Sequence, residues 1–136
     1  MFTEKERAYL KSQRLARIAT VAPDGQPDVV PVGFEFDGAT FYVGGHNVTK
    51  TRKYKNVQAG QVRVALVVDD LVSIDPWRPR GIRVYGNAEL VKRDGRLGRT
   101  TYLQLSPLVT WSWNVEGPSA HKTVHAARRR GAPVAY

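Results

Sequence analysis

Residues 15–27 read Leu-Ala-Arg-Ile-Ala-Thr-Val-Ala-Pro-Asp-Gly-Gln-Pro. Apolar and polar side chains alternate from Leu15 to Val21, which is the pattern of a half-buried β-strand. Asp24 and Gly25 then supply the positive φ that a tight hairpin turn requires. The stretch therefore predicts a strand over 15–21 that turns back, antiparallel, into a second strand.

The second strand is expected from about 27 to 36 and ends at the Asp-Gly turn that follows. Pro31 lies inside it, and because proline has no N–H to donate to a neighbour, this strand must lie at an edge of its sheet or be bulged. A short third strand is expected at 39–44. The segment 63–69 is almost continuously apolar, which favours a strand buried on both faces.

The remaining elements complete a mainly β architecture. Strand patterns occupy 82–91 and 108–115, with a weakly helical segment at 96–104 between them, and 71–79 is expected to be a loop. A capping-box pattern, Thr-Glu-Lys-Glu, predicts a helix over 4–13, and a basic helix is expected to start at Thr49. Six strands joined by tight turns indicate a six-stranded antiparallel β-barrel with a few short helices.

The glycine turn at 44–47, Gly-Gly-His-Asn, and the basic helix after it form the most suggestive site in the sequence. Lys50, Arg52, Lys53 and Lys55 follow within two helical turns. A helix start normally favours acidic side chains, so cations there suggest that the negative charge belongs to a ligand. A solvated basic helix face is the equally weighted alternative.

Length and composition bound the class of protein. The 136 residues suit one domain, predicted over 1–118, followed by a basic tail at 119–136 whose arginine run is expected to be solvated. No apolar run is long enough to span a bilayer and no signal-peptide pattern opens the chain, so we expect a cytoplasmic protein that does not enter a membrane. Cysteine is absent. His121 and His125 have the spacing to share a helix face, but no carboxylate completes a site, so no metal is expected.

The formal net charge of +9 raises the question of nucleic acid. Neither a recognition helix nor a row of stacking aromatics is complete, so nucleic-acid binding is not expected. The sequence also lacks a nucleophile triad, paired carboxylates at a plausible site and a P-loop. An enzyme with this inventory needs an organic cofactor, whose phosphate would suit Lys50 and Arg52.

Four segments occur in the order found in the pyridoxamine-phosphate-oxidase-like split barrels, and the chain resembles that family over nearly its whole length. The segments are 15–27, 30–34 (Val-Pro-Val-Gly-Phe), 50–52 (Lys-Thr-Arg) and 81–89 (Gly-Ile-Arg-Val-Tyr-Gly-Asn-Ala-Glu). Within the family, 44–47, 68–71 and 75–78 resemble the deazaflavin (coenzyme F-420)-dependent branch, in the subgroup of the oxytetracycline-pathway reductase. The resemblance implies an FMN-binding type of split barrel and a homodimer with two cofactor sites at its interface.

The resemblance also implies which residues bind the cofactor. The set is Pro31, Val32, Gly33, Gly44, Gly45, His46, Lys50, Thr51, Arg52, Lys53, Trp77, Arg78 and Arg80. The members at 50–52 would hold the phosphate with Lys53 as a further candidate, the main chain at 31–33 would lie beside the ring, and 44–46 would form the floor. The members at 77–80 would come from the partner chain or line the substrate pocket. For Trp77 the competing interpretation is an interface anchor, and for His46 it is a loop cap.

The implied activity is that of an oxidoreductase. A reduced deazaflavin delivers a hydride to a C=C, C=N or C=O bond of a small-molecule substrate, and His46, Arg78 and Arg80 are the candidates for polarising that bond or supplying a proton. The first alternative is FMN in the same fold, which the basic surface disfavours because deazaflavin carries a longer acidic tail beyond its phosphate. The second is a non-enzymatic barrel that binds a cofactor or nucleic acid.

Overall fold

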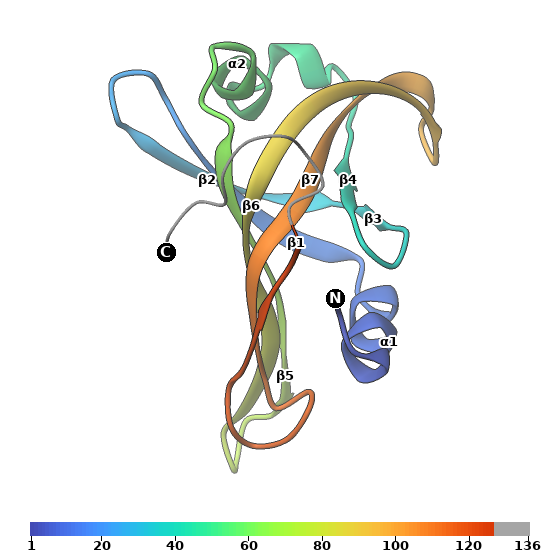
Figure 1. Ribbon diagram of the computed structural model, residues 1–136, viewed down its shortest axis with the longest axis vertical. Helices are drawn as coiled ribbons and strands as arrows, with labels where there is room; N and C mark the ends of the chain where they lie inside the picture. Colours follow the sequence, from blue (N-terminus) through green and yellow to red (C-terminus); the bar gives the residue numbers. More distant parts are fainter. Residues whose placement is uncertain (127–136) are drawn as a thin grey trace.

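Eight strands in one antiparallel sheet dominate the computed structural model, which describes residues 1–126 (Figure 1). The strands are β1 (Leu15–Val21), β2 (Pro27–Gly33), β3 (Glu35–Phe36), β4 (Phe41–Val43), β5 (Arg63–Ser73), β6 (Arg78–Gly95), β7 (Gly98–Trp113) and β8 (His121–Val124). Their order is β2-β1-β5-β6-β7-β4-β3, with β8 paired to β7. The mainly β, antiparallel prediction is confirmed. The pairings describe an open order rather than a closed barrel.

The strand count is eight where we expected six, for two local reasons. The predicted strand 27–36 is divided at Phe34: β2 pairs with β1, whereas β3 pairs with β4 at the other end of the sheet. The second addition is β8, which pairs with residues 109–112 of β7. Phe34 is only 6% exposed, so the chain crosses between the two ends of the sheet with an apolar side chain anchored in the core.

The helix predicted at 96–104 is wrong, because residues 98–104 form the first half of β7 and 96–97 form the turn before it. Gly95 and Gly98 pair across a two-residue turn, and Gly98 has a φ of 87°, a conformation that suits glycine. The loop predicted at 71–79 is also shorter than expected. Strand β5 continues to Ser73 and β6 begins at Arg78, which leaves only 74–77 as the turn.

Two α-helices and one 3-10 helix accompany the sheet. Helix α1 (Glu4–Ser12) begins with the predicted capping box, in which Thr3 caps the helix and Glu6 bonds back to it. The basic segment starts differently from the prediction. A 3-10 helix, η1 (Val48–Lys50), comes first, and α2 (Arg52–Gln58) follows with Thr51, rather than Thr49, as its N-cap.

The first hairpin follows its sequence pattern closely. Leu15 pairs with Gly33 and Val21 with Pro27, so β1 and β2 lie antiparallel along their full lengths. No other strand of the described chain pairs with β2, which confirms the edge position predicted from Pro31. The core is built on fully buried residues such as Ile18, Leu66, Phe41, Ile82 and Leu103.

Part of the predicted tail forms regular structure. Residues 121–124 of the predicted tail form β8, while the arginine run at 128–130 lies outside the described residues. The boundary at 118 stays a prediction. His121 and His125 do not share a helix face, because they lie at and just beyond the ends of a strand. Within 1–126, no helix combines the length and apolar character needed to cross a membrane.

Candidate functional site

A pocket of about 220 Å³ opens between the end of β2, β3, β4 and the tip of the β6–β7 hairpin. Its lining comprises Gly33, Phe34, Glu35, Tyr42, Gly44, Gly45, His46, Arg96, Leu97 and Tyr102. Four of these, Gly33, Gly44, Gly45 and His46, belong to the set implied by the sequence. The fold therefore gathers into one cavity two groups of candidates that are a dozen residues apart in the chain.

The floor and the hairpin tip of this pocket are packed against each other. A Cβ atom on Gly44 would lie 2.7 Å from Tyr102, so only glycine fits under that ring. Tyr102 is fully buried, and its hydroxyl accepts a hydrogen bond from Leu97 N at 3.1 Å and donates one to Gly98 O at 3.1 Å. The same ring thus fixes the tip and shapes the floor.

Glu35 ties the tip to β3 by using both of its carboxylate oxygens. Oε1 accepts from Arg93 Nη1 at 2.9 Å and Oε2 accepts from the main-chain N of Arg96 at 2.8 Å. Burial by itself would raise the pKa of Glu35, but the bonds from Arg93 and Arg96 outweigh it and hold the pKa below its usual value. Arg93 also stacks 3.9 Å from the centre of the Tyr42 ring. Sequence reasoning missed Glu35, Tyr42 and Arg96, which no motif marks.

The basic segment after the pocket divides into exposed and buried cations. Lys50 and Arg52 are exposed, and neither side chain makes a hydrogen bond or ion pair within the described part of the chain. Lys53, in contrast, is 9% exposed, and burial lowers its pKa although Asp28 opposes this shift. The Thr51 hydroxyl is already engaged, donating to Val48 O at 2.6 Å and accepting from Tyr54 N at 3.4 Å. Lys50 and Arg52 are therefore available to an anion, as is the exposed Lys55 farther along α2.

Residues 31–33 present main chain more than side chains. Val32 is 7% exposed and points into the core, while Pro31 and Gly33 are exposed. Because β2 is an edge strand, its outer side carries no strand partner among residues 1–126. Gly33 at its end lines the pocket. The edge of β2 thus leads into the cavity.

The candidates at 77–80 lie far from this pocket within one chain. They follow the β5–β6 turn, which Figure 1 shows at the opposite end of the sheet from α2. Trp77 is 65% exposed at that turn, and Arg78 is exposed beside it. A single chain does not bring Trp77 or Arg78 to the cavity that holds His46.

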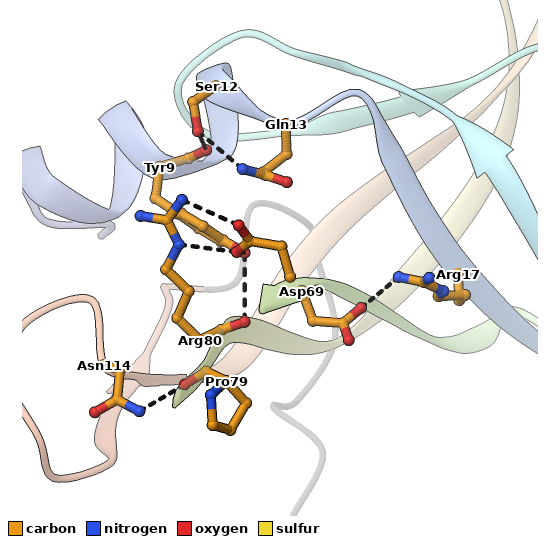
Figure 2. Close-up of polar contacts among 9 residues, drawn as sticks. Tyr9, Ser12, Gln13, Arg17, Asp69, Pro79, Arg80 and Asn114 are labelled. Atoms are coloured by element: carbon orange, nitrogen blue, oxygen red, sulfur yellow. Dashed lines mark hydrogen bonds and ion pairs between the residues drawn. The ribbon is translucent and has the colours of Figure 1, made fainter. Parts of the chain in front are cut away.

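Arg80 is engaged in a polar network with α1 and β5 (Figure 2). Its Nε and Nη2 donate to Asp70 at 2.8 and 3.1 Å, and its guanidinium lies 4.8 Å from the centre of the Tyr9 ring. The Tyr9 hydroxyl donates to the same carboxylate at 2.8 Å. Arg80 holds the pKa of Asp70 below its usual range, and burial together with Asp70 raises that of Tyr9. Arg80 thus links α1 to the sheet, through its contact with Tyr9 and its ion pair with Asp70.

The histidines at the C-terminal end have structural partners. His121 Nδ1 lies 3.4 Å from the fully buried Glu6 carboxylate, and His125 Nε2 lies 2.9 Å from Thr110 Oγ1. Burial lowers the pKa of His125 to about 4. Among the described residues, no three His, Cys, Asp or Glu side chains gather as a metal would require.

Comparison with known proteins matches residues 2–118 to the family described as pyridoxamine 5'-phosphate oxidase. A protein of Streptomyces rimosus named 5a,11a-dehydrotetracycline/5a,11a-dehydrooxytetracycline reductase is 37% identical over 122 residues, which is 85% of each chain. A solved structure described as an F420 reductase is 25% identical with a TM-score of 0.56, covering 71% of this chain and 88% of its own. A conserved hypothetical protein from Mycobacterium tuberculosis has the same fold, with a TM-score of 0.66, 21% identity, and coverage of 95% and 96%.

Proposed function

Given that the chain belongs to the pyridoxamine 5'-phosphate oxidase family, we propose that it is an oxidoreductase that uses reduced coenzyme F-420 to reduce a C=C, C=N or C=O bond of a small molecule. The S. rimosus relative is named as a reductase, and a structural neighbour is described as an F420 reductase. These names support reduction as the reaction and a deazaflavin as the hydride source. The unsaturated ring system in the relative's name supports a polycyclic substrate.

The observation that carries the proposal is the continuity between the pocket and the exposed cations at 50 and 52. His46 lines the cavity, η1 begins two residues later, and Lys50 and Arg52 flank the start of α2 without partners among the described residues. Arginine and lysine are the side chains that bind phosphate most strongly, through charge-assisted hydrogen bonds. A cofactor with a ring and a phosphate therefore finds complementary chemistry in adjoining places. The net charge of +9 favours the more acidic F-420 over FMN.

In this proposal the protein positions the cofactor and substrate. When bound, reduced F-420 supplies the hydride. Lys50 and Arg52 hold the phosphate, the glycines at 44–45 let the floor approach the ring closely, and the main chain of β2 at 31–33 flanks it. His46 is exposed at the pocket and has the chemistry to donate a proton to the reduced substrate.

We further propose that the working form is a homodimer. The β5–β6 turn exposes Leu71, Val72, Ile74 and Trp77, an unusual concentration of apolar surface for a monomer. Arg78 stands beside it, at the far end of the molecule from the pocket. A second chain that receives this turn near its own His46 would bury the apolar residues and complete each site with an arginine.

The cofactor assignment is tested by titrating the K50Q/R52Q variant with oxidised F-420 and with FMN, followed by fluorescence. Loss of two charge-assisted bonds should weaken F-420 binding by about 100-fold or more, at roughly 1.5 kcal/mol or more per bond. The matched control is Lys55→Gln, which removes an exposed cation from the same helix outside the predicted set. Unchanged F-420 affinity in K50Q/R52Q refutes the phosphate site, and tighter binding of FMN than of F-420 by the wild type refutes the choice of cofactor.

The composite site is tested by complementation between chains. K50Q/R52Q and W77A/R78Q are each expected to lose catalytic turnover as homodimers. A heterodimer prepared from the two should regain one intact site, because one chain supplies Lys50 and Arg52 while the other supplies Trp77 and Arg78. No recovery in a purified heterodimer, or a monomer in light scattering, would contradict the proposal.

A further inference from the structure

We propose that Arg96 binds a second anionic oxygen of the ligand, separate from the phosphate, and that Glu35 is the positioning residue that makes Arg96 available. This inference rests on the proposed function and adds to it a subsite at the β6–β7 tip. None of the residues implied by the sequence lies at the tip of this hairpin, around 95–98. The ligand group is a carboxylate or an enolate.

Arg96 is a cation whose guanidinium forms no hydrogen bond or ion pair within residues 1–126, in a pocket whose one carboxylate, Glu35, already pairs with Arg93. Glu35 lies in the same lining and pairs with the Arg93 side chain, while Arg96 donates its main-chain N–H to Glu35 and its charge helps to lower the pKa of Glu35. Two guanidinium charges therefore act on one carboxylate, which leaves one net positive charge at the pocket, where the Arg96 side chain is exposed.

The hairpin tip that carries Arg96 is held from both sides. Glu35 fixes the main chain at Arg96, and the Tyr102 hydroxyl bonds to Leu97 N and Gly98 O. A turn held in this way loses little conformational entropy when a ligand binds, so more of the interaction energy appears as affinity. The position of the guanidinium is set before the ligand arrives.

The surrounding surface indicates what kind of anion fits. Phe34 and Tyr42 contribute aromatic surface to the pocket, and His46 belongs to the same lining. A planar guanidinium in such a setting matches a carboxylate or an enolate oxygen through paired hydrogen bonds. Two molecules in the proposed reaction offer this chemistry. The tail of F-420 carries carboxylates beyond its phosphate, and a polar substrate bound in the pocket offers an enolate or a carboxylate.

The test compares Arg96→Gln with Arg99→Gln in folded protein. Arg99 is on the same hairpin, its side chain is 65% exposed, it pairs with Asp94, and it does not line the pocket. Each variant is titrated with oxidised F-420 and with FMN, and benzoate binding to the F-420 complex is followed by saturation-transfer NMR. Benzoate serves as an aromatic carboxylate of a size the pocket can admit.

Two results support the inference and identify the source of the anion. If R96Q weakens F-420 about 10- to 100-fold and leaves FMN unchanged, the anion is the tail carboxylate of the cofactor. If both cofactors bind as in the wild type but R96Q loses the benzoate signal that the wild type gives, the anion belongs to the substrate. In either case R96K should recover part of the loss, and R99Q should behave as wild type.

Three results overturn it. The first is that R96Q weakens the binding of F-420 and of FMN equally. The second is that R96Q and R99Q lose the same amount of ligand binding. The third is that R96Q changes neither F-420 binding nor benzoate binding, which includes the case in which the wild type gives no benzoate signal. The Glu35→Gln variant separates positioning from general stability. It should reproduce, in the same direction, whichever change R96Q causes, in F-420 affinity or in benzoate binding, and add little to it in the double variant. Because R96Q leaves Lys50 and Arg52 intact, its failure is distinguishable from failure of the phosphate site.

Discussion

Replacement of Gly44 by alanine should destabilise the protein through one buried ring. The added Cβ would lie 2.7 and 2.8 Å from two carbons of Tyr102 and 3.2 Å from Leu97 Cδ1. Ordinary contact begins at 3.4 Å, so the ring must retreat by at least about 0.7 Å, the difference between 3.4 and 2.7 Å. Tyr102 has no exposed surface through which to relax.

The size of the destabilisation follows from the packing around Gly44 and from the hydrogen bonds of the Tyr102 hydroxyl, both of which this movement disturbs. Forcing an extra methyl group into a packed site costs about 1–3 kcal/mol. Strain on the two hydroxyl bonds of Tyr102 to the hairpin tip adds about 1 kcal/mol. The free energy of unfolding should therefore fall by about 2–4 kcal/mol, which for a chain of this size lowers Tm by roughly 6–12 °C.

The assay is thermal and urea unfolding followed by circular dichroism, with Gly33→Ala as the matched control. Gly33 lines the same pocket, but a Cβ there meets nothing within 4 Å, so its free energy of unfolding should change by less than about 0.5 kcal/mol. In a Tyr102→Leu background, Gly44→Ala should lower the free energy of unfolding by much less, because the ring that obstructs the added Cβ is absent. A wild-type Tm for G44A, or an equal loss in G33A, would refute the packing argument.

Two further substitutions test buried titratable groups. Lys53→Met should raise the free energy of unfolding by about 1 kcal/mol, because burial disfavours the Lys53 charge. F-420 affinity should stay unchanged. A loss of F-420 affinity like that of K50Q/R52Q would instead show that Lys53 binds the phosphate. For His125, whose pKa burial lowers to about 4, the unfolded chain takes up the proton first as pH falls from 6.5. The free energy of unfolding of the wild type should drop by about 1 kcal/mol between pH 6.5 and 5, allowing for partial exposure of His125. In urea unfolding, His125→Asn should show a smaller change of this free energy with pH. If the variant depends on pH as the wild type does, His125 is not the cause.

The parts of the fold that sequence predicted are those with local causes. The capping box at Thr3 and Glu6 and the Asp-Gly turn of the first hairpin each depend on residues within a few positions, and both are confirmed. Pro31 marked an edge strand because its missing N–H is a property of one residue. Local chemistry also placed a glycine turn before a basic helix, although the helix begins two residues later than expected.

The errors and omissions arise where tertiary contacts override local pattern. Residues 98–104 have weak helical preference but pair with β6 along its whole second half, and this pairing decides their conformation. Glu35 and Arg96 meet only because β3 and the β6–β7 tip come together, and they are 61 residues apart. No spacing rule reveals such a pair. The candidates at 77–80 pose the same difficulty between two chains, since their proposed role depends on a partner.

The proline in β2 has a consequence for how copies of this protein meet one another. An exposed strand edge invites uncontrolled strand addition and aggregation, and β2 offers one, with Val29 65% exposed beside it. Pro31 removes a donor from the middle of that edge and so interrupts any regular ladder. The β5–β6 turn, rich in exposed apolar side chains, carries no such obstacle. The chain thus discourages indiscriminate self-association at the β2 edge, whereas nothing of this kind obstructs the dimer contact that we propose at the β5–β6 turn.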